Sequence, residues 1–483
     1  MSFTFDSKQI FIDGAWRDGL SGKFVELVDP STGEMLALVA RGSAADIDAA
    51  VVAAQAALDG DWGAMTAVER GRVLAKMGEI VLTHIDELAE MEAKDVGKPL
   101  TQARNDVIAM ARYFEFYGGA CDKIHGDSIP FMDGFTVYTL REPHGVTGHI
   151  IPWNYPMQII GRSVGAALAM GNAAVLKPAE EACLTALALG EIAVEAGLPA
   201  GALNIVPGIG SEAGAALTAH TGVHHISFTG SNAVGTMVQQ SGGEHVIPVT
   251  LELGGKSPQI VFDDADLDAA MPFLVNGGIQ NAGQTCSAAS RILVQRGIYD
   301  EVVAGMVAQY KALKVGNALD DLNLGPMISK RQQEIVKGYL SIAKTDGLQM
   351  LAQGSYADGL PEGGAYILPT LFGDVSPEHR LAQEEIFGPV QVLIPFDDEA
   401  DAVRIANCTD FGLVAGVWTE NGGRQLRMAK KLQVGQVFIN NYGAAGGVEL
   451  PFGGVKGSGH GREKGFEALY GFSVTKTVAI KHG

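Results

Sequence analysis

The sequence predicts an α/β protein with two successive α/β domains, the first around a doubly wound parallel sheet, and a small additional β element. Strands and helices alternate from residue 146 to Gly255, a pattern typical of a parallel sheet covered by helices. A second alternating series follows Gly255 and indicates the second domain. A length of 483 residues and an apolar content of 47% suit two or three well-buried domains.

The first third of the chain is expected to be mainly helical. Residues 44–58 and 68–93 carry apolar residues at intervals of three and four, the spacing of an amphipathic helix. Around residues 124–141 the pattern changes to two short alternating stretches divided by Met132-Asp133-Gly134, which predicts a hairpin. This hairpin has few local partners, so we expect it to project towards another domain or subunit.

The central region predicts a parallel sheet with ligand-binding strand ends. The expected strands are 146–152, 173–178, 203–208, 224–230 and 249–255, with helices up to Met170 and over 184–197. Ligands of doubly wound sheets bind beyond the carboxyl ends of the strands. Lys177, Gly230 and Glu252 all fall at such ends.

The region after Gly255 predicts a second sheet. Its expected strands are 257–262, 290–295, 390–396, 413–419 and 435–440, with helices beginning near Asp300 and Ser329. Residues 473–481 form a final alternating stretch that has no neighbour in the sequence, so this strand is expected to pair non-locally.

Composition narrows the classes of partner. A formal net charge of −20 argues against nucleic acid, because binding a phosphate backbone needs clustered lysine and arginine. No run approaches about eighteen apolar residues, and the N-terminus lacks the pattern of a signal peptide, so we expect neither a membrane span nor secretion. The four cysteines, Cys121, Cys183, Cys286 and Cys408, are scattered without metal-ligand spacing, which predicts reduced thiols, no metal site and a cytoplasmic location.

Cys286 stands in QNAGQTCSAAS, residues 280–290, among small and polar neighbours. Two interpretations are open from these residues alone. A free cysteine is usually a small buried hydrophobic residue. A thiol with open space around it can instead act as a nucleophile.

Two segments could bind a nucleotide. FTGSNAVG, residues 228–235, places Gly230, Ser231 and Gly235 where a strand meets a helix, and helix N-termini attract phosphate, although a plain turn fits equally well. LKPAEE places Lys177 and Glu180 just past another strand, where a carboxylate can accept hydrogen bonds from a ribose diol. A solvated charge pair is the alternative there.

Two polar residues could assist a reaction. Glu252 ends an apolar strand, where burial would raise its pKa and allow it to act as a base, or it is a surface glutamate before a turn. Asn154 stands in IIPWNYP between Pro152 and Pro156, so its amide could stabilise an oxyanion or could simply support the turn.

Taken together, these segments resemble the aldehyde dehydrogenase superfamily over nearly the whole chain. The resemblance rests on PWNYP, GNAAVLKPAE, GLPAGALNIVPG, FTGSNAVG, LELGGKSP, NAGQTC, EEIFGPV and PFGGVKGSGHGRE, in the family's order and spacing. It implies a Rossmann-like coenzyme-binding domain (1–121 and 143–254) and a catalytic domain (255–455). It also implies an oligomerisation hairpin with a C-terminal bridging segment (122–142 and 456–483), and hence a homodimer or homotetramer.

The resemblance implies NAD(P)-dependent oxidation of a small-molecule aldehyde to its acid. Cys286 would attack the aldehyde carbon to form a thiohemiacetal, with Asn154 stabilising the oxyanion. Hydride transfer to the nicotinamide would leave a thioester. Glu252 would activate the water that hydrolyses it, and Glu463 would stand behind this base as a proton relay.

The same resemblance implies NAD as cofactor, with NADP as an alternative. A carboxylate at Glu180 should repel a 2′-phosphate. The cofactor-binding residues would be Pro152, Trp153, Lys177, Glu180, Gly230, Ser231, Gly235, Glu385 and Phe387.

Tyr155, Arg162 and Phe452 would line the substrate pocket. Arg162 resembles the arginine with which semialdehyde dehydrogenases hold a substrate carboxylate, and also that of benzaldehyde-type members. Many semialdehyde enzymes carry a second arginine where this chain has Gln280, and Arg162 could instead pair with a protein acid. Residues 440–450 are rich in glycine and alanine, which predicts a roomy mouth for an aromatic, long-chain or semialdehyde substrate.

Three other functions compete. A coenzyme A-acylating relative usually lacks the base, so Glu252 argues against it. A non-catalytic relative would not need Cys286, Glu252 and Asn154 together. A cofactor-free cysteine hydrolase leaves the second alternating domain and LKPAE unexplained.

Overall fold

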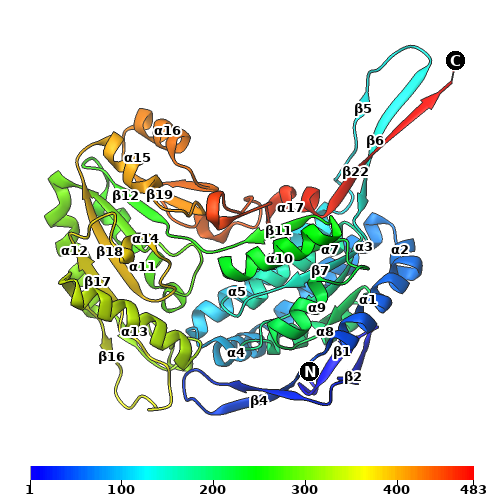
Figure 1. The fold of residues 1–483 in the computed structure, drawn as a ribbon, viewed down its shortest axis with the longest axis horizontal. Coiled ribbons are helices and arrows are strands. Elements are labelled where there is room, and N and C mark those ends of the chain that lie inside the picture. Colours follow the sequence, from blue (N-terminus) through cyan, green and yellow to red (C-terminus); the bar gives the residue numbers. More distant parts are fainter. Residues whose placement is uncertain (1, 483) are drawn as a thin grey trace.

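The computed structural model describes residues 2–482 and contains two main sheets (Figure 1). Met1 and Gly483, at the outer limits of two expected segments, lie outside the described residues. The first sheet has the strand order β2-β1-β9-β8-β7-β10-β11-β21. Its parallel centre consists of β9 (Leu203–Ile205), β8 (Ala173–Lys177), β7 (Val146–Ile150), β10 (His225–Thr229) and β11 (Val249–Glu252). The predicted doubly wound sheet is therefore confirmed.

Helices cover this sheet. They are α1 (Ala44–Asp59), α2 (Asp61–Ala64), α3 (Ala67–Thr83), α4 (Ile85–Val96), α5 (Leu100–Ala120), α6 (Pro156–Ile159), a π-helix (Ile160–Val164), α7 (Gly165–Ala169), α8 (Leu184–Glu195), a second π-helix (Gly210–Gly214), α9 (Ala215–Thr218) and α10 (Asn232–His245). The continuous helical pattern over 68–93 is interrupted at His84, which caps α3 and begins α4.

The expectation of a mainly helical first third was wrong for residues 9–40. Four short strands lie there: β1 (Gln9–Ile12), β2 (Ala15–Asp18), β3 (Phe24–Val28) and β4 (Met35–Ala40). β1 and β2 extend the first sheet in antiparallel orientation, and β3 pairs with β4. β1 is short and mostly buried, whereas the side chains of β2, β3 and β4 are only partly buried, so the apolar periodicity that marks a strand is weak in this part of the sequence.

The second sheet has the order β15-β17-β18-β13-β12-β19-β20. Its strands are β15 (Gln349–Gln353), β17 (Thr370–Gly373), β18 (Val390–Phe396), β13 (Arg291–Gln295), β12 (Pro258–Val261), β19 (Val414–Trp418) and β20 (Gln436–Ile439). All neighbours are parallel except β15 with β17, and these two strands were not predicted. The surrounding helices are α11 (Leu267–Ile279), α12 (Tyr299–Ala312), α13 (Lys330–Thr345), α14 (Arg380–Gln383), α15 (Glu399–Asn407) and α16 (Gly422–Lys431), and β14 (Lys314–Val315) pairs with β16 (Ser355–Tyr356).

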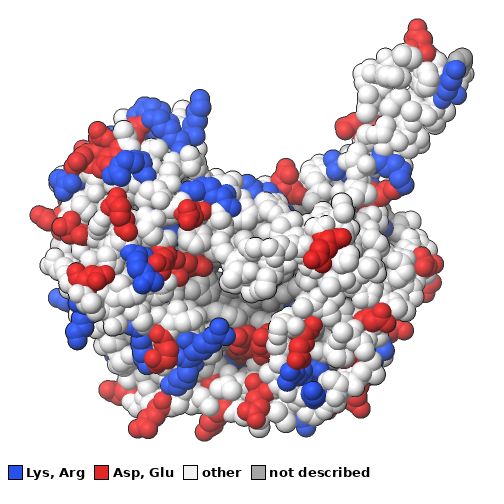
Figure 2. Space-filling model, viewed as in Figure 1, with Lys and Arg blue, Asp and Glu red and all other residues white. Residues whose placement is uncertain are grey.

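A β arm projects from the body of the molecule (Figure 1). It consists of β5 (Ser128–Ile129), β6 (Phe135–Pro143) and β22 (Ser473–Lys481). β22 pairs with β6 in antiparallel register from Ser473↔Pro143 to Lys481↔Phe135, which confirms the predicted hairpin and the non-local pairing of the last strand. Few charged side chains lie on the arm in Figure 2.

The remaining C-terminal elements reach back to the first sheet. β21 (Gly459–His460) pairs with β11, and α17 (Gly465–Gly471) leads into the arm. Each main sheet has its own apolar core, and a small cluster of Leu413, Val414, Phe438 and Phe452 lies beside Cys286. None of the helices within residues 2–482 is long and apolar enough to cross a bilayer.

Candidate active site

One cavity of about 1200 Å³ is lined by residues from both sheets. The first sheet contributes residues at the carboxyl ends of β7, β8, β10 and β11, as expected for a doubly wound sheet. The second contributes Cys286 and its neighbours. Of the predicted site residues, Pro152, Trp153, Asn154, Tyr155, Arg162, Lys177, Glu180, Gly230, Ser231, Glu252, Cys286, Glu385, Phe387 and Phe452 line the cavity.

The loop that carries Cys286 has an unusual backbone. Asn281, Ala282 and Gly283 follow α11 with φ angles of 50°, 53° and 73°, and such angles are strained for residues other than glycine. Gln102, on α5, accepts a hydrogen bond of 2.9 Å from the Asn281 backbone N–H. This contact joins the Cys286 loop to α5. It could not be predicted from the sequence, because no motif surrounds Gln102.

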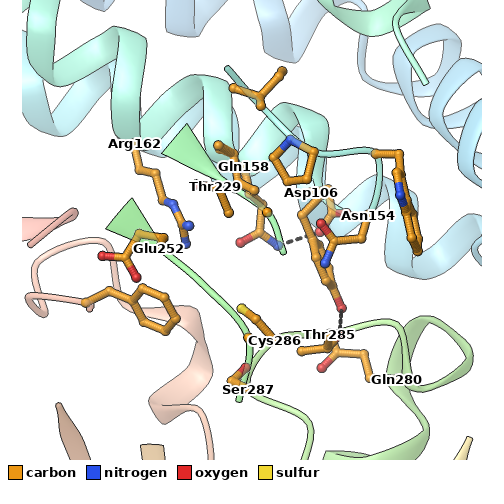
Figure 3. A pocket seen from close by; sticks show the side chains of 18 of the residues that line it. Asp106, Asn154, Gln158, Arg162, Thr229, Glu252, Gln280, Thr285, Cys286 and Ser287 are labelled. Atoms are coloured by element: carbon orange, nitrogen blue, oxygen red, sulfur yellow. Dashed lines mark hydrogen bonds between the residues drawn. The ribbon is translucent and has the colours of Figure 1, made fainter. Parts of the chain in front are cut away.

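Asn154 is hydrogen-bonded to the same loop. Its Nδ2 donates to the Gln284 carbonyl at 3.0 Å, and its own carbonyl accepts from Asn281 Nδ2 at 3.0 Å. The Asn154 side chain is 5% exposed and lies across the cavity from Glu252 (Figure 3). These two hydrogen bonds fix the Asn154 amide against the loop that carries Cys286.

Cys286 is half-buried and lies beside Thr285 and Ser287 in the wall of the cavity (Figure 3). Burial raises the pKa of its thiol to about 11. The Arg162 guanidinium opposes this shift, whereas the carboxyls of Glu385 and Glu252 add to it. Arg162 is therefore the nearby charge that favours the thiolate.

Glu252 ends β11 with its carboxyl buried in the cavity wall. The residue is 1% exposed, and neither carboxyl oxygen has a hydrogen-bond partner among residues 2–482. Burial and the neighbouring Glu463 raise its pKa well above the ordinary value, while Arg162 opposes the shift. A Cβ at Gly453 would stand 2.7 Å from Glu252 Oε1, so glycine there leaves room for the carboxyl. The surface alternative for Glu252 is excluded.

Arg162 belongs to the π-helix of residues 160–164 and pairs with a protein acid. Its Nε forms an ion pair with Glu463 Oε2, without the alignment of a hydrogen bond. Its Nη2 is buried and has no partner in the described part of the chain. The guanidinium also lies over the Phe452 ring, 4.9 Å from the centroid. In Figure 3 the Arg162 and Glu252 side chains point towards one another.

Glu463 lies behind the cavity wall and does not line it. It is fully buried, and its Oε1 accepts a hydrogen bond of 2.9 Å from Ser227 Oγ on β10. The Ser227 hydroxyl accepts in turn a hydrogen bond from Ser163 Oγ. Ser163 Oγ also shares a hydrogen bond of 2.6 Å with His149 Nδ1. Arg162 thus stands between Glu463 and the groups that face the cavity.

The opposite end of the cavity combines a helix N-terminus with a charge pair. Ser231 caps α10, and its side chain accepts from Val234 N–H at 3.5 Å. Lys177 Nζ donates to Glu180 Oε2 at 3.0 Å, and Lys177 lowers the pKa of Glu180 although burial opposes the shift. Gly235 does not line the cavity. A Cβ there would stand 2.5 Å from Leu253, so the absence of a side chain allows α10 to pack closely against the residue after β11.

Glu385 and Phe387 line the same cavity. Glu385 Oε1 accepts a hydrogen bond of 2.8 Å from Gly255 N–H, and burial raises its pKa to about 7. Phe387 has a φ of 53° and packs edge-on against Trp153 with ring centroids 5.3 Å apart. Lys256 is buried nearby, and burial lowers its pKa to about 7.

The glycine-rich loop of residues 440–450 lines a further part of the cavity. Gly443, Ala445, Gly446, Gly447 and Val448 all contribute to its wall. Tyr155 and Thr285 share a hydrogen bond of 2.6 Å on the other side. Sequence reasoning missed Tyr442, whose hydroxyl donates to the Ser287 carbonyl at 2.6 Å, and Lys464, which also lines this part of the cavity.

Fold and site define an α/β protein with two main sheets, and the cavity lined from both presents a thiol beside a buried carboxyl. The chain belongs to the aldehyde dehydrogenase family, whose sequence model matches residues 16–478. The resemblance found in the sequence is therefore confirmed.

Individual relatives are similar over their full length. An aldehyde dehydrogenase of Emericella nidulans is 41% identical over 98% of this chain and 95% of its own. A crystal structure of a Burkholderia cenocepacia protein, provisionally named an aldehyde dehydrogenase, is 59% identical with a TM-score of 0.98 and covers 98% of this chain and 100% of its own. The NAD⁺ complex of an aldehyde dehydrogenase from Bacillus cereus is 40% identical with a TM-score of 0.96, over 99% and 97% of the two chains.

Proposed function

We propose that this protein oxidises an aldehyde to its carboxylic acid with NAD as the oxidant. The observation that carries the proposal is the placement of Cys286, Asn154 and Glu252 around one cavity. Cys286 attacks the aldehyde carbon, and the oxyanion of the thiohemiacetal receives hydrogen bonds from the Asn154 amide and the backbone N–H of Cys286. The enzyme class follows from membership of the family.

Residues of this chain also account for the second step, the hydrolysis of the thioester. Loss of hydride from the substrate carbon leaves a thioester on Cys286. Glu252 takes a proton from the attacking water, since its raised pKa makes it a stronger base than an exposed glutamate. Glu463 cannot touch the substrate, so we assign it to positioning Arg162 and to receiving a proton behind Glu252.

The far end of the cavity suits a dinucleotide. Bound NAD would accept the hydride from the substrate carbon. The N-terminus of α10 at Ser231 would hold the pyrophosphate, Lys177 and Glu180 the adenosine ribose, and Glu385 the nicotinamide ribose. Thr229 lies opposite Glu252 in the pairing of β10 with β11, and its buried Oγ1 has no partner within residues 2–482, which fits a cavity built to receive a polar ligand. Pro152, Trp153, Gly230 and Phe387 complete the expected binding surface.

Replacing the nucleophile tests this function. The Cys286→Ala protein should bind NAD as the wild type does and form no NADH with any aldehyde. Retained dehydrogenase turnover would contradict the proposal. The wild type should form NADH stoichiometrically without an added thiol, which separates it from a coenzyme A-acylating enzyme.

Cofactor choice can be tested at one residue. The Glu180 carboxylate should disfavour the 2′-phosphate of NADP, so kcat/KM should be higher with NAD. Glu180→Ala should narrow that preference by about tenfold, the effect of removing one repulsion of about 1.4 kcal/mol. A wild-type preference for NADP would refute this assignment.

For the quaternary structure we propose a homodimer or homotetramer. Residues 122–142 and 456–483 would join subunits, 1–121 and 143–254 would form the coenzyme domain, and 255–455 the catalytic domain. The projecting arm supports this, since Phe131 and Met132 are exposed on it. Sedimentation showing only a 50.6 kDa species would contradict it. A cytoplasmic location stays a prediction from the sequence.

A further inference from the structure

Lys464 is a cation of the substrate end of the cavity to which neither the motifs nor the proposed function assigns a role. It lines the cavity with Cys286, Glu252 and Phe452, and it is half-buried. Its Nζ lies 5.5 Å from the centroid of the Phe452 ring. The only side-chain hydrogen bond of Lys464 among the described residues is a long one of 3.4 Å, from Nζ to the Gly446 carbonyl.

We propose that Lys464 binds a carboxylate at the distal end of the substrate, so that the preferred substrates are aldehydes that also carry an acid group. This rests on the proposed aldehyde oxidation. Arg162 has the supporting role, because its buried Nη2 faces the same end of the cavity and has no protein partner in residues 2–482.

Most acids around this end are paired with other cations; the exception is Glu252, which lines the same cavity and forms no ion pair with Lys464. Glu463 contacts Arg162, and Asp106 contacts Lys98. Glu449, at the cavity mouth, pairs with Arg112 at 2.5 Å. No carboxylate lies within ion-pair distance of Lys464 in the described chain. The carboxylate of a substrate would therefore be the counter-ion of its amine.

The backbone at Lys464 also turns its side chain into the cavity. Its φ of 61° and ψ of 166° lie in a region that glycine adopts and other residues rarely do. Glu463, one residue earlier, is buried behind the wall, whereas Lys464 lines the cavity. A strained conformation of this kind is kept where the surroundings or the function require it.

Arg162 and Lys464 contact the same aromatic ring. Their charged groups lie 4.9 and 5.5 Å from the centroid of Phe452. Burial and the nearby Arg162 lower the pKa of Lys464 to about 8, so the amine is still mostly charged at pH 7. A substrate that extends from Cys286 past Phe452 would bring an anionic end to the amine, and a cationic aldehyde would be repelled.

Two aldehydes that differ by one carboxylate test the proposal. Wild-type kcat/KM should be about tenfold or more higher for 4-carboxybenzaldehyde than for benzaldehyde, as expected for a hydrogen bond to a charged group. Lys464→Met should bring the ratio of the two kcat/KM values close to one, mainly by raising KM for 4-carboxybenzaldehyde. Lys464→Arg should restore most of it. Lys311→Met, at an exposed position on α12, is the matched control.

Lys464→Gly separates loss of the amine from misfolding. Glycine relieves the backbone strain, so this variant should melt at a higher temperature than Lys464→Met and show the same loss of preference. If Lys464→Met lowered kcat/KM equally for both aldehydes, or if the wild type preferred benzaldehyde, Lys464 would not be a specificity residue.

Binding of the two product acids keeps this test independent of turnover. Calorimetry should show terephthalate binding about tenfold more tightly than benzoate to the wild type, and equally weakly to Lys464→Met. Equal affinities in the wild type would overturn the carboxylate site even if aldehydes were oxidised. Tight terephthalate binding by a protein that oxidises no aldehyde would instead overturn the proposed function and retain the carboxylate site.

Discussion

Two buried clusters of one cation and two carboxyls lie near the same cavity, and they differ in how their atoms are paired. The Lys98 cluster contains Glu92, Lys98 and Asp106, and the Arg162 cluster contains Arg162, Glu252 and Glu463. Lys98 Nζ contacts Glu92 at 2.9 Å and also contacts Asp106. The remaining oxygens of those acids accept from Thr185 and Gln158.

In the Arg162 cluster the pairing is incomplete. Arg162 contacts Glu463 but not Glu252, whose two oxygens have no partner in residues 2–482. Unpaired polar atoms in a protein interior cost stability, and groups left in that state are often ones that act on a ligand. The comparison therefore separates a cluster that supports the fold from one that carries the reaction.

The largest expected effect is on turnover in the Arg162 cluster. Glu252→Gln should lower steady-state turnover by about 10²- to 10⁴-fold, because the water that hydrolyses the thioester loses its base. A first-turnover burst of NADH should remain, since hydride transfer precedes hydrolysis. Stopped-flow absorbance would measure both phases, and unchanged steady-state turnover would remove Glu252 from this role.

Breaking the Lys98 cluster should affect stability instead. Lys98→Met leaves Glu92 and Asp106 buried without a counter-charge, which should lower the free energy of unfolding by about 3–5 kcal/mol. Urea unfolding followed by circular dichroism would measure this. Lys94→Met, which removes an exposed pair with Glu90 on the same helix, should cost less than about 1 kcal/mol. Equal effects of the two substitutions would show that burial of the cluster does not matter.

The thiol beside the Arg162 cluster should respond strongly to pH. With a pKa near 11, the thiolate fraction of Cys286 rises about tenfold per pH unit between pH 7 and 9. Alkylation by iodoacetamide without cofactor, followed by mass spectrometry of the Cys286 peptide, should rise accordingly. Arg162→Met should slow it, because the guanidinium lowers this pKa. A pH-independent rate would indicate that another group activates the thiol.

The last prediction concerns the effect of the buried Glu252 carboxyl on the free energy of unfolding. The pKa of Glu252 is raised in the folded state. The folded protein therefore keeps its full free energy of unfolding below about pH 4.5 and loses part of it as pH rises from there through the folded pKa. Glu252→Gln should therefore be more stable than the wild type, by an amount that grows with pH by up to about 1.4 kcal/mol per unit. Urea midpoints from pH 5 to 8 would measure it, and a constant difference would contradict burial of the charge.

The strand ends could be predicted from the sequence because parallel strands place their carboxyl ends at one edge. Lys177 and Glu252 end strands, and Gly230 follows one, in which every residue is buried, so short apolar runs mark where these strands stop. The backbone of the Cys286 loop could not be predicted, since Asn281 and Ala282 adopt positive φ only through contacts with distant residues.

Pairing partners also lay beyond the sequence. The pattern left open whether Arg162 binds a substrate or a protein acid, and the structure pairs it with Glu463, about 300 residues away. The orientation of Lys464 depends on an uncommon backbone conformation that a lysine in the sequence does not predict. Residues such as these are identified by three-dimensional contacts rather than by local pattern.

The β arm has a consequence for the order of synthesis. β6 emerges from the ribosome early, yet its nine-residue partner β22 follows roughly 330 residues later. At about 5–20 residues per second, the edge of β6 stays without that partner for tens of seconds. During this interval the hydrogen-bonding edge and the apolar side chains of the hairpin are exposed to other nascent chains, so the last strand to be translated closes the surface most open to aggregation.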